Sequence, residues 1–168
     1  MSSPTGLILA AALITPINTE HFSAQLPGKW RAHPIEKSGV VEMGSYEQQD
    51  GPGFLTTSVM AFRADAAQDR EARRAALQNI VNLRRKAIVE LSHGDATFGP
   101  DEVDENRWGY PSISSSYVDR RSGIVGRFCA LLTAKKIIGF MYYEHSTVLE
   151  TAVRDRAELI LKQVRVVP

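Results

Sequence analysis

The sequence contains a single cysteine, Cys129, so no disulfide can form within the chain. Cys129 lies in the apolar run 128–132, where a free cysteine is typically a buried, unreactive thiol. The histidines stand at positions 21, 33, 93 and 145, too far apart to match the spacing of a metal site. We therefore expect no metal, no cofactor and no catalytic residues, although a catalytic set assembled from distant positions stays open.

An excess of charge of one sign is also lacking. The 20 Lys and Arg residues and the 19 Asp and Glu residues leave a formal net charge of +1. The basic residues form no clustered stripe of the kind that replaces counterions on a nucleic acid. With 168 residues, 43% of them hydrophobic and 23% charged, the chain has the composition of one globular domain. We therefore expect no nucleic-acid partner.

The apolar segment 6–14 has the length of the hydrophobic core of a signal peptide. It is too short to cross a bilayer as a helix, which needs about 20 apolar residues. No Lys or Arg precedes it, although Ala10 and Ala12 have the spacing of a cleavage site. We interpret residues 1–19 as an N-terminal extension, either a strand or an export remnant, and residues 20–168 as one domain without an integral membrane segment. The compartment stays open between cytoplasm and periplasm.

The periods of apolar and polar residues predict an α+β domain. Strands are predicted near 22–26, 40–47, 54–63, 110–118, 124–132 and 137–145. Helices are predicted near 66–92 and from about residue 147, and the acidic segment 95–105 is predicted to be a loop. Both alternating sets of side chains are largely apolar in the last two strands. We therefore expect a central antiparallel sheet that is covered on both faces, by one helix on each.

The helix ends carry their own signals. Asp65 and Gln68 have the spacing of a capping box, and Gly94 follows the last apolar position of the long helix. The final helix begins with a similar pattern at Thr147. Its predicted apolar stripe consists of Leu149, Val153, Ala157, Ile160 and Val164.

Two arginines, Arg73 and Arg84, are the unusual feature of the long helix. At 100° per residue both fall within the apolar stripe that contains Leu77, Ile80 and Leu91, so both should face the sheet or its margin. A guanidinium does not deprotonate, and burying it unpaired costs several kcal/mol.

Two interpretations of these arginines stay open. In the first, each arginine carries its head to water or pairs with a carboxylate such as Glu42, Glu105 or Glu144. In the second, they form a basic spot beneath the helix that receives an acidic ligand or an acidic residue of a partner.

Other residues are weaker candidates. The aromatic side chains of Trp30, Trp108, Tyr110 and Tyr142 could line a partner-binding groove, although aromatic residues more often stabilise a core. The serines of segment 112–116 leave room for a helix of the same domain or for an incoming peptide. The segment 101–105 lacks the alternating ligands and central glycine of an EF-hand loop, which favours a solvated loop over a calcium site.

From about residue 20 onward, the order of elements resembles the PsbP-like and DcrB-like superfamily. The similarity is carried by the opening strand that ends in Leu26-Pro27-Gly28-Lys29-Trp30 and by Trp108-Gly109-Tyr110-Pro111 before a three-strand meander. The resemblance implies an α/β/α sandwich with the long helix on one face of the sheet and the C-terminal helix on the other. It also implies a non-enzymatic accessory protein, because members are mainly photosynthetic subunits, lipoproteins, an import factor and chaperones of type VI secretion effectors. The sequence departs from the lipoproteins, since it has no lipobox cysteine.

Three functions follow as hypotheses. The first is an adaptor that binds another protein, such as a chaperone or immunity protein of a type VI secretion effector. The second is a periplasmic carrier of a small ligand or lipid, which requires a deep apolar cavity between sheet and helix. The third is a hydrolase of unrecognised type, which requires convergent polar groups with perturbed pKa values.

Overall fold

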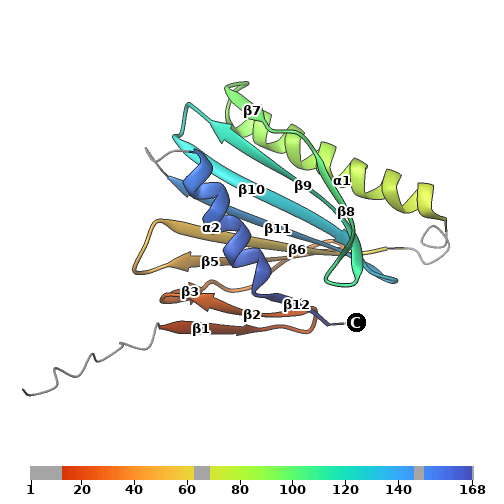
Figure 1. Cartoon of the computed structure of the whole chain (residues 1–168), viewed down its shortest axis with the longest axis horizontal. Helices are drawn as coiled ribbons and strands as arrows, with labels where there is room; N and C mark the ends of the chain where they lie inside the picture. Colours follow the sequence, from red (N-terminus) through yellow and green to blue (C-terminus); the bar gives the residue numbers. More distant parts are fainter. Residues whose placement is uncertain (1–12, 63–68, 146–149, 168) are drawn as a thin grey trace, which may run out of the picture.

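The computed structural model describes residues 13–62, 69–145 and 150–167 (Figure 1). Within these residues, the strands form a large nine-stranded sheet and a small three-stranded sheet, both antiparallel. The same residues contain two helices, α1 (Arg70–Leu91) and α2 (Glu150–Lys162). The predicted α+β class, with one helix on each face of a central antiparallel sheet, is confirmed.

The strand orders complete the description of the two sheets. The large sheet runs β3 (Trp30–Ala32), β5 (Val41–Gln48), β6 (Gly53–Ala61), β11 (Lys136–His145), β10 (Ile124–Leu132), β9 (Tyr110–Asp119) and β7 (Ala96–Phe98). At its margins β4 (Glu36–Ser38) pairs with β5, and β8 (Glu102–Arg107) pairs with β9. The small sheet runs β1 (Ile14–Asn18), β2 (Phe22–Pro27) and β12 (Val164–Val166).

Side chains on the two faces of the large sheet form two separate cores. On one face, α2 and the small sheet pack over side chains such as Leu55, Ile138 and Phe140. On the other face, α1 packs over Ile113 and Phe128. The apolar residues at both alternating positions of β10 and β11 are explained by this arrangement, since each strand contributes to both cores.

The predicted strands are confirmed as β2, β5, β6, β9, β10 and β11, with ends that agree within a residue or two. The β5–β6 hairpin and the β9–β10–β11 meander are also as predicted. β1 pairs with β2 along its whole length, so residues 14–18 belong to the small sheet rather than to an extension that ends at residue 19.

Two of the predicted secondary-structure assignments are wrong. Segment 95–105 is not a loop, because its backbone pairs with β9 as β7 and β8. Five of its residues are acidic and few are apolar, so the alternation that marks a half-buried strand is missing. The second error concerns Val164, which was assigned to the final helix. This helix ends at Lys162, and Val164 pairs with Ala24 in the small sheet.

Of the two signals predicted at the ends of α1, the one at the C-terminal end is confirmed. Its N-cap is Asp69, whose carboxylate accepts a hydrogen bond from the backbone N–H of Glu71. The predicted box of Asp65 and Gln68 lies outside the described residues. At the other end Gly94 has a φ of +87°, a conformation that glycine adopts without strain, and the helix stops before it as predicted.

The buried stripe of α1 is rotated relative to the prediction. Its buried residues are Leu77, Val81 and Ile88, whereas Leu91 is 81% exposed. At 100° per residue the centre of this stripe lies about 40° from Arg84. Arg84 therefore lies on one flank of α1 rather than directly beneath it. Neither helix in the described ranges is long and apolar enough to cross a membrane.

Candidate functional site

One flank of α1 is closed by β7 and by the segment that leads into β8. Arg85 reaches across to this segment, where its Nη2 lies 2.6 Å from Oδ1 of Asp101 and also donates to the hydroxyl of Ser115. The Arg85 guanidinium lies over the ring of Phe98, 5.4 Å from its centroid. This flank is therefore sealed by a charged side chain whose Nη atoms have several partners, although its buried Nε has none among the described residues.

The opposite flank of α1 is open. The helix packs mainly on β9 and β10, so the part of the same sheet face formed by β11, β6 and β5 has no helix over it in the described structure (Figure 1). An apolar groove of about 240 Å³ lies here. It is lined by Val41, Met43, Ser58, Met60, Ile80, Leu83, Arg84, Ala87 and Ile137, and we call it the open groove. Leu83 is 63% exposed and Met43 is 40% exposed.

Methionines gather on this part of the sheet. Met60 lies opposite Val41 and Ile137, and Met43 lies opposite Ser58, so both methionines share the α1-side face of the sheet. Met141 is on the same face, because it lies two pairs further along β11 from Gly139, opposite Thr56. All methionines after Met1 are therefore on one face. Flexible, polarisable methionine side chains are typical of surfaces that adapt to a binding partner.

Arg84 is the charged residue of the open groove. It is half-buried, and burial lowers the pKa of its guanidinium, an effect that the nearby Tyr117 partly opposes. Among the described residues, no side chain forms an ion pair or a hydrogen bond with Arg84. The carboxylates that were predicted as partners pair elsewhere. Glu42 lies near Lys37 and His21, Glu105 near Arg70, and Glu144 near Arg156.

Arg73 lies in a different cleft. This second cleft, of about 270 Å³, is formed by the first turns of α1 and by the ends of β8 and β9. Its lining residues are Arg70, Arg73, Arg74, Leu77, Val103, Glu105, Pro111, Ser112 and Ile113. The Nε of Arg73 is buried and has no hydrogen-bond partner among the described residues, while Arg70 pairs with Glu105 at 3.2 Å. The two candidate arginines therefore do not form one basic spot.

The aromatic candidates lie on the other side of the sheet. Trp30 and Tyr142 are 7% and 2% exposed and belong to the core beneath α2, and the Trp30 indole N–H donates to the carbonyl of Pro27. Trp108 and Tyr110 are half-buried against the same core. The structure thus gives these four residues a packing role and joins none of them to the open groove.

The serines of β9 are covered from within the domain. Ser115 faces α1 and donates to the carbonyl of Gly99, whereas Ser114 faces α2 and accepts a hydrogen bond from Arg127. Both serines are almost fully buried. The room that their small side chains leave is occupied by the side chains of Arg85, which comes from α1, and of Arg127, so a helix of the same domain covers Ser115 as one of the two predictions had it.

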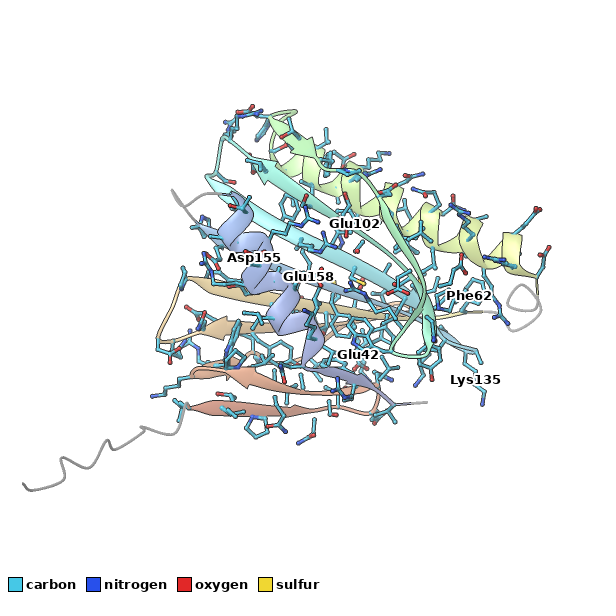
Figure 2. All side chains as sticks on the ribbon, viewed as in Figure 1. Glu42, Phe62, Glu102, Lys135, Asp155 and Glu158 are labelled. Carbon is cyan, nitrogen blue, oxygen red and sulfur yellow. The ribbon has the colours of Figure 1, made fainter. Side chains whose placement is uncertain are left out.

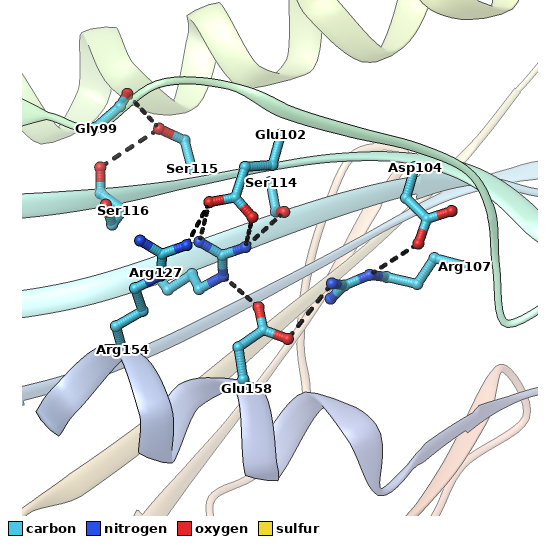
Figure 3. A network of polar contacts seen from close by, with 10 residues as sticks. All are labelled: Gly99, Glu102, Asp104, Arg107, Ser114, Ser115, Ser116, Arg127, Arg154 and Glu158. Atoms are coloured by element: carbon cyan, nitrogen blue, oxygen red, sulfur yellow. Dashed lines mark hydrogen bonds and ion pairs between the residues drawn. The ribbon is translucent and has the colours of Figure 1, made fainter. Parts of the chain in front are cut away.

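A buried ion-pair network joins α2 to the sheet (Figure 3). The side chain of Arg127 on β10 is 1% exposed and lies between two carboxylates, 2.8 Å from Glu102 and 2.5 Å from Glu158. Arg154 also contacts Glu102, and Arg107 contacts Glu158. Figure 2 labels Glu102 on β8 and Glu158 on α2, the two elements that bring these carboxylates to Arg127. Burial acts to lower the pKa of the Arg127 guanidinium, but the interactions with Glu102 and Glu158 outweigh burial and raise this pKa.

The prediction that the acidic residues of 101–105 are solvated is correct for Asp104 and Glu105, which are exposed, and wrong for Asp101 and Glu102. Asp101 and Glu102 hold arginines of α1 and β10, so these acidic side chains tie the edge of the sheet to the rest of the fold. The sequence contained a signal for this network. Arg127 occupies an inward position of a strand that is otherwise apolar at that register, where a charge requires a buried partner.

A second buried carboxylate, Glu144 on β11, is fully covered. The guanidinium of Arg156 on α2 contacts both of its oxygens, at 2.5 and 2.7 Å, and the hydroxyl of Tyr142 donates to it at 2.5 Å. Burial acts to raise the pKa of Glu144, but the hydrogen bonds from Arg156 and Tyr142 outweigh it and hold the pKa below the ordinary carboxyl value. This network, like that of Arg127, satisfies its own charges and leaves none for a substrate.

No constellation typical of catalysis or metal binding is found in the described part of the chain. Burial raises the pKa of the Cys129 thiol to about 11, so the thiol stays protonated. Within residues 13–62, 69–145 and 150–167, no three His, Cys, Asp or Glu side chains are grouped to hold a metal ion. No described histidine hydrogen-bonds a serine or cysteine side chain. The open groove, which combines exposed apolar side chains with a half-buried arginine, is the candidate functional site, and its lining is suited to binding.

Comparisons with known proteins give no assignment. No family model matches the sequence, and a search of the curated proteins found no match. The resemblance to the PsbP-like and DcrB-like superfamily therefore stays a prediction.

Proposed function

We propose that this chain is a non-catalytic accessory protein that binds another protein through the open groove. The observation that carries the proposal is the incomplete cover of the α1-side sheet face. Two apolar side chains that border the groove, Met43 and Leu83, are 40% and 63% exposed. Contiguous exposed apolar surface costs solubility, and it commonly marks a place where another molecule binds.

The size and shape of the groove favour a protein over a small ligand. Pockets that enclose a drug-sized molecule typically measure about 300–1,000 Å³ and bury most of its surface. The open groove measures about 240 Å³ and is bordered by exposed side chains. A small ligand or lipid carrier is the second candidate, supported by the cation of Arg84 within an apolar lining, which suits an amphiphile with an acidic head group.

The family resemblance favours one specific form of the proposal. In this form the chain is a chaperone or immunity protein that binds a type VI secretion effector. The open groove itself supports only the general form, because its lining does not distinguish an effector from another protein partner.

The experiment is capture of partners from the native host, followed by quantitative mass spectrometry. We compare the wild-type protein with Leu83→Glu, which places a charge in the groove, and with Leu159→Glu as a matched control. Leu159 is similarly exposed, at 56%, but lies on α2, on the other side of the sheet. The proposal expects a protein that is recovered with wild type and Leu159→Glu and lost with Leu83→Glu. Equal recovery with all three baits would contradict it.

A further inference from the structure

Adjacent arginines of α1, Arg84 and Arg85, have opposite environments. Arg85 contacts Asp101, Ser115 and the carbonyl of Gly99 on the closed flank of the helix. Arg84 points to the other flank and has neither an ion pair nor a hydrogen bond among the described residues. The fold thus pairs the guanidinium of Arg85 with a carboxylate, whereas the guanidinium of Arg84 has no carboxylate partner among the described residues.

The surroundings of Arg84 would strengthen an interaction with an anion. Its neighbours in the groove are Ile80, Leu83 and Met60, apolar side chains that reduce contact with water. The attraction between opposite charges increases as the local dielectric falls, and a charged hydrogen bond is stronger than a neutral one. A carboxylate that entered the groove would therefore gain more here than at an exposed arginine.

The width of the uncovered surface restricts the shape of a partner. Three strands, β11, β6 and β5, lie beyond α1 on this face. Neighbouring strands are about 4.8 Å apart, so these strands offer a surface about 10–14 Å wide. An α-helix with its side chains is about 10–12 Å across. One additional helix, packed beside α1, would complete the cover of the sheet.

We propose that the open groove binds an amphipathic helix of a partner protein, and that an Asp or Glu within the apolar face of this helix pairs with Arg84. This inference rests on the proposed function and specifies its partner. Apolar side chains of the bound helix would contact Met43, Met60 and Leu83, and methionines can adjust to the shape of such a helix.

The test uses a displayed library of helical peptides. The stripe positions i, i+3, i+4 and i+7 are randomised among apolar residues, Asp, Glu, Asn and Gln, and peptides are selected on the full-length wild-type protein. Binding at the groove is defined by its loss in Leu83→Glu and its retention in Leu159→Glu. We expect the selected peptides to carry one acidic residue within the apolar stripe.

The decisive measurement is a double-mutant cycle on a selected peptide, read by fluorescence anisotropy. Replacing the acidic residue by its amide should weaken binding to wild type by about ten- to a hundredfold. Arg84→Met should weaken binding of the acidic peptide by a similar factor. The Arg84→Met protein should therefore bind the acidic peptide and its amide version with equal affinity. Arg74→Met, an exposed arginine on the same helix, serves as the control and should leave the affinity unchanged.

Each alternative outcome is distinct. Peptides that bind at the groove without preferring an acidic residue would overturn this inference and leave the proposed function in place. Failure to select any peptide that is sensitive to Leu83→Glu would overturn both. Binding of dodecanoate that depends on Arg84, without any such peptide, would replace both by the carrier function. If Arg84→Met does not fold, the comparison of acidic and amide peptides on wild type still decides the question.

Discussion

Breaking the ion pair of Glu144 and Arg156 should lower the free energy of unfolding by very different amounts, depending on which of the two residues is replaced. The side chain of Glu144 is 0% exposed, whereas that of Arg156 is 40% exposed. In Arg156→Met the carboxylate stays buried and keeps only the hydrogen bond from Tyr142, so we expect a loss of about 3 kcal/mol in the free energy of unfolding. In Glu144→Gln the arginine can turn to water, and we expect a loss of about 1 kcal/mol.

The pH dependence should distinguish the two variants further. In wild type the pKa of Glu144 is lowered by Arg156 and Tyr142, so its contribution to stability is present above the pKa of an unfolded carboxyl, about 4.3, and is lost as the pH falls through the lowered value. In Arg156→Met burial is offset only by the hydrogen bond from Tyr142, so the pKa of Glu144 rises. The loss of stability should then be complete at pH 7 and should shrink as the pH falls through the raised pKa.

Urea denaturation followed by circular dichroism at pH 7 and pH 5 measures both effects. We expect the difference in the free energy of unfolding between Arg156→Met and Glu144→Gln to be about 2 kcal/mol at pH 7 and smaller at pH 5. Equal losses for the two variants at pH 7, or a gap that widens at pH 5, would show that the burial of Glu144 does not control the energetics of this pair.

Two further predictions concern α1 and the single cysteine. Leu77 is 2% exposed and Leu83 is 63% exposed, so Leu77→Ala should lower the free energy of unfolding by about 2–5 kcal/mol, while Leu83→Ala should stay within about 0.5 kcal/mol of wild type. A similar loss for both would mean that α1 does not face the sheet as described. Cys129 is 1% exposed and the pKa of its thiol is raised to about 11, so it should not react with a thiol reagent at pH 8 until the protein is unfolded. Rapid labelling of the native protein would contradict this packing.

The main elements of the fold could be predicted because their signals are local. The meander strands show alternating apolar residues, and the α1 helix stops before Gly94, which adopts a positive φ. β8 could not be predicted in this way, because Glu102, Asp104 and Glu105 interrupt any apolar alternation. β8 pairs with the next strand, β9, as a hairpin, but the charge of Glu102 is compensated by Arg127, which comes from a strand further along the sequence.

The candidate site could be predicted only in part. Arg84 was found from its angular position on the helix, since a charged residue near an apolar stripe is visible in the sequence. The open groove was not predicted, because the apolar residues on both faces of β10 and β11 suggested a fully covered sheet. Apolar periodicity shows that a strand face is apolar, but it does not show whether one helix is wide enough to cover five strands. Sequence reasoning also grouped Arg73 with Arg84, which the structure places in separate clefts.

The most direct test of the central claim, that Arg84 is available for recognition and is not required by the fold, needs no partner. It compares the free energy of unfolding of Arg84→Met and Arg85→Met with that of wild type by urea denaturation at neutral pH. Because Arg84 has no partner among the described residues, Arg84→Met should be within about 0.5 kcal/mol of wild type or more stable. Arg85→Met should lose about 1–2 kcal/mol, because Asp101 loses its ion-pair partner and keeps only the hydrogen bond from Gln78. A loss of about 2 kcal/mol or more in Arg84→Met would contradict the account and make Arg84 a structural residue.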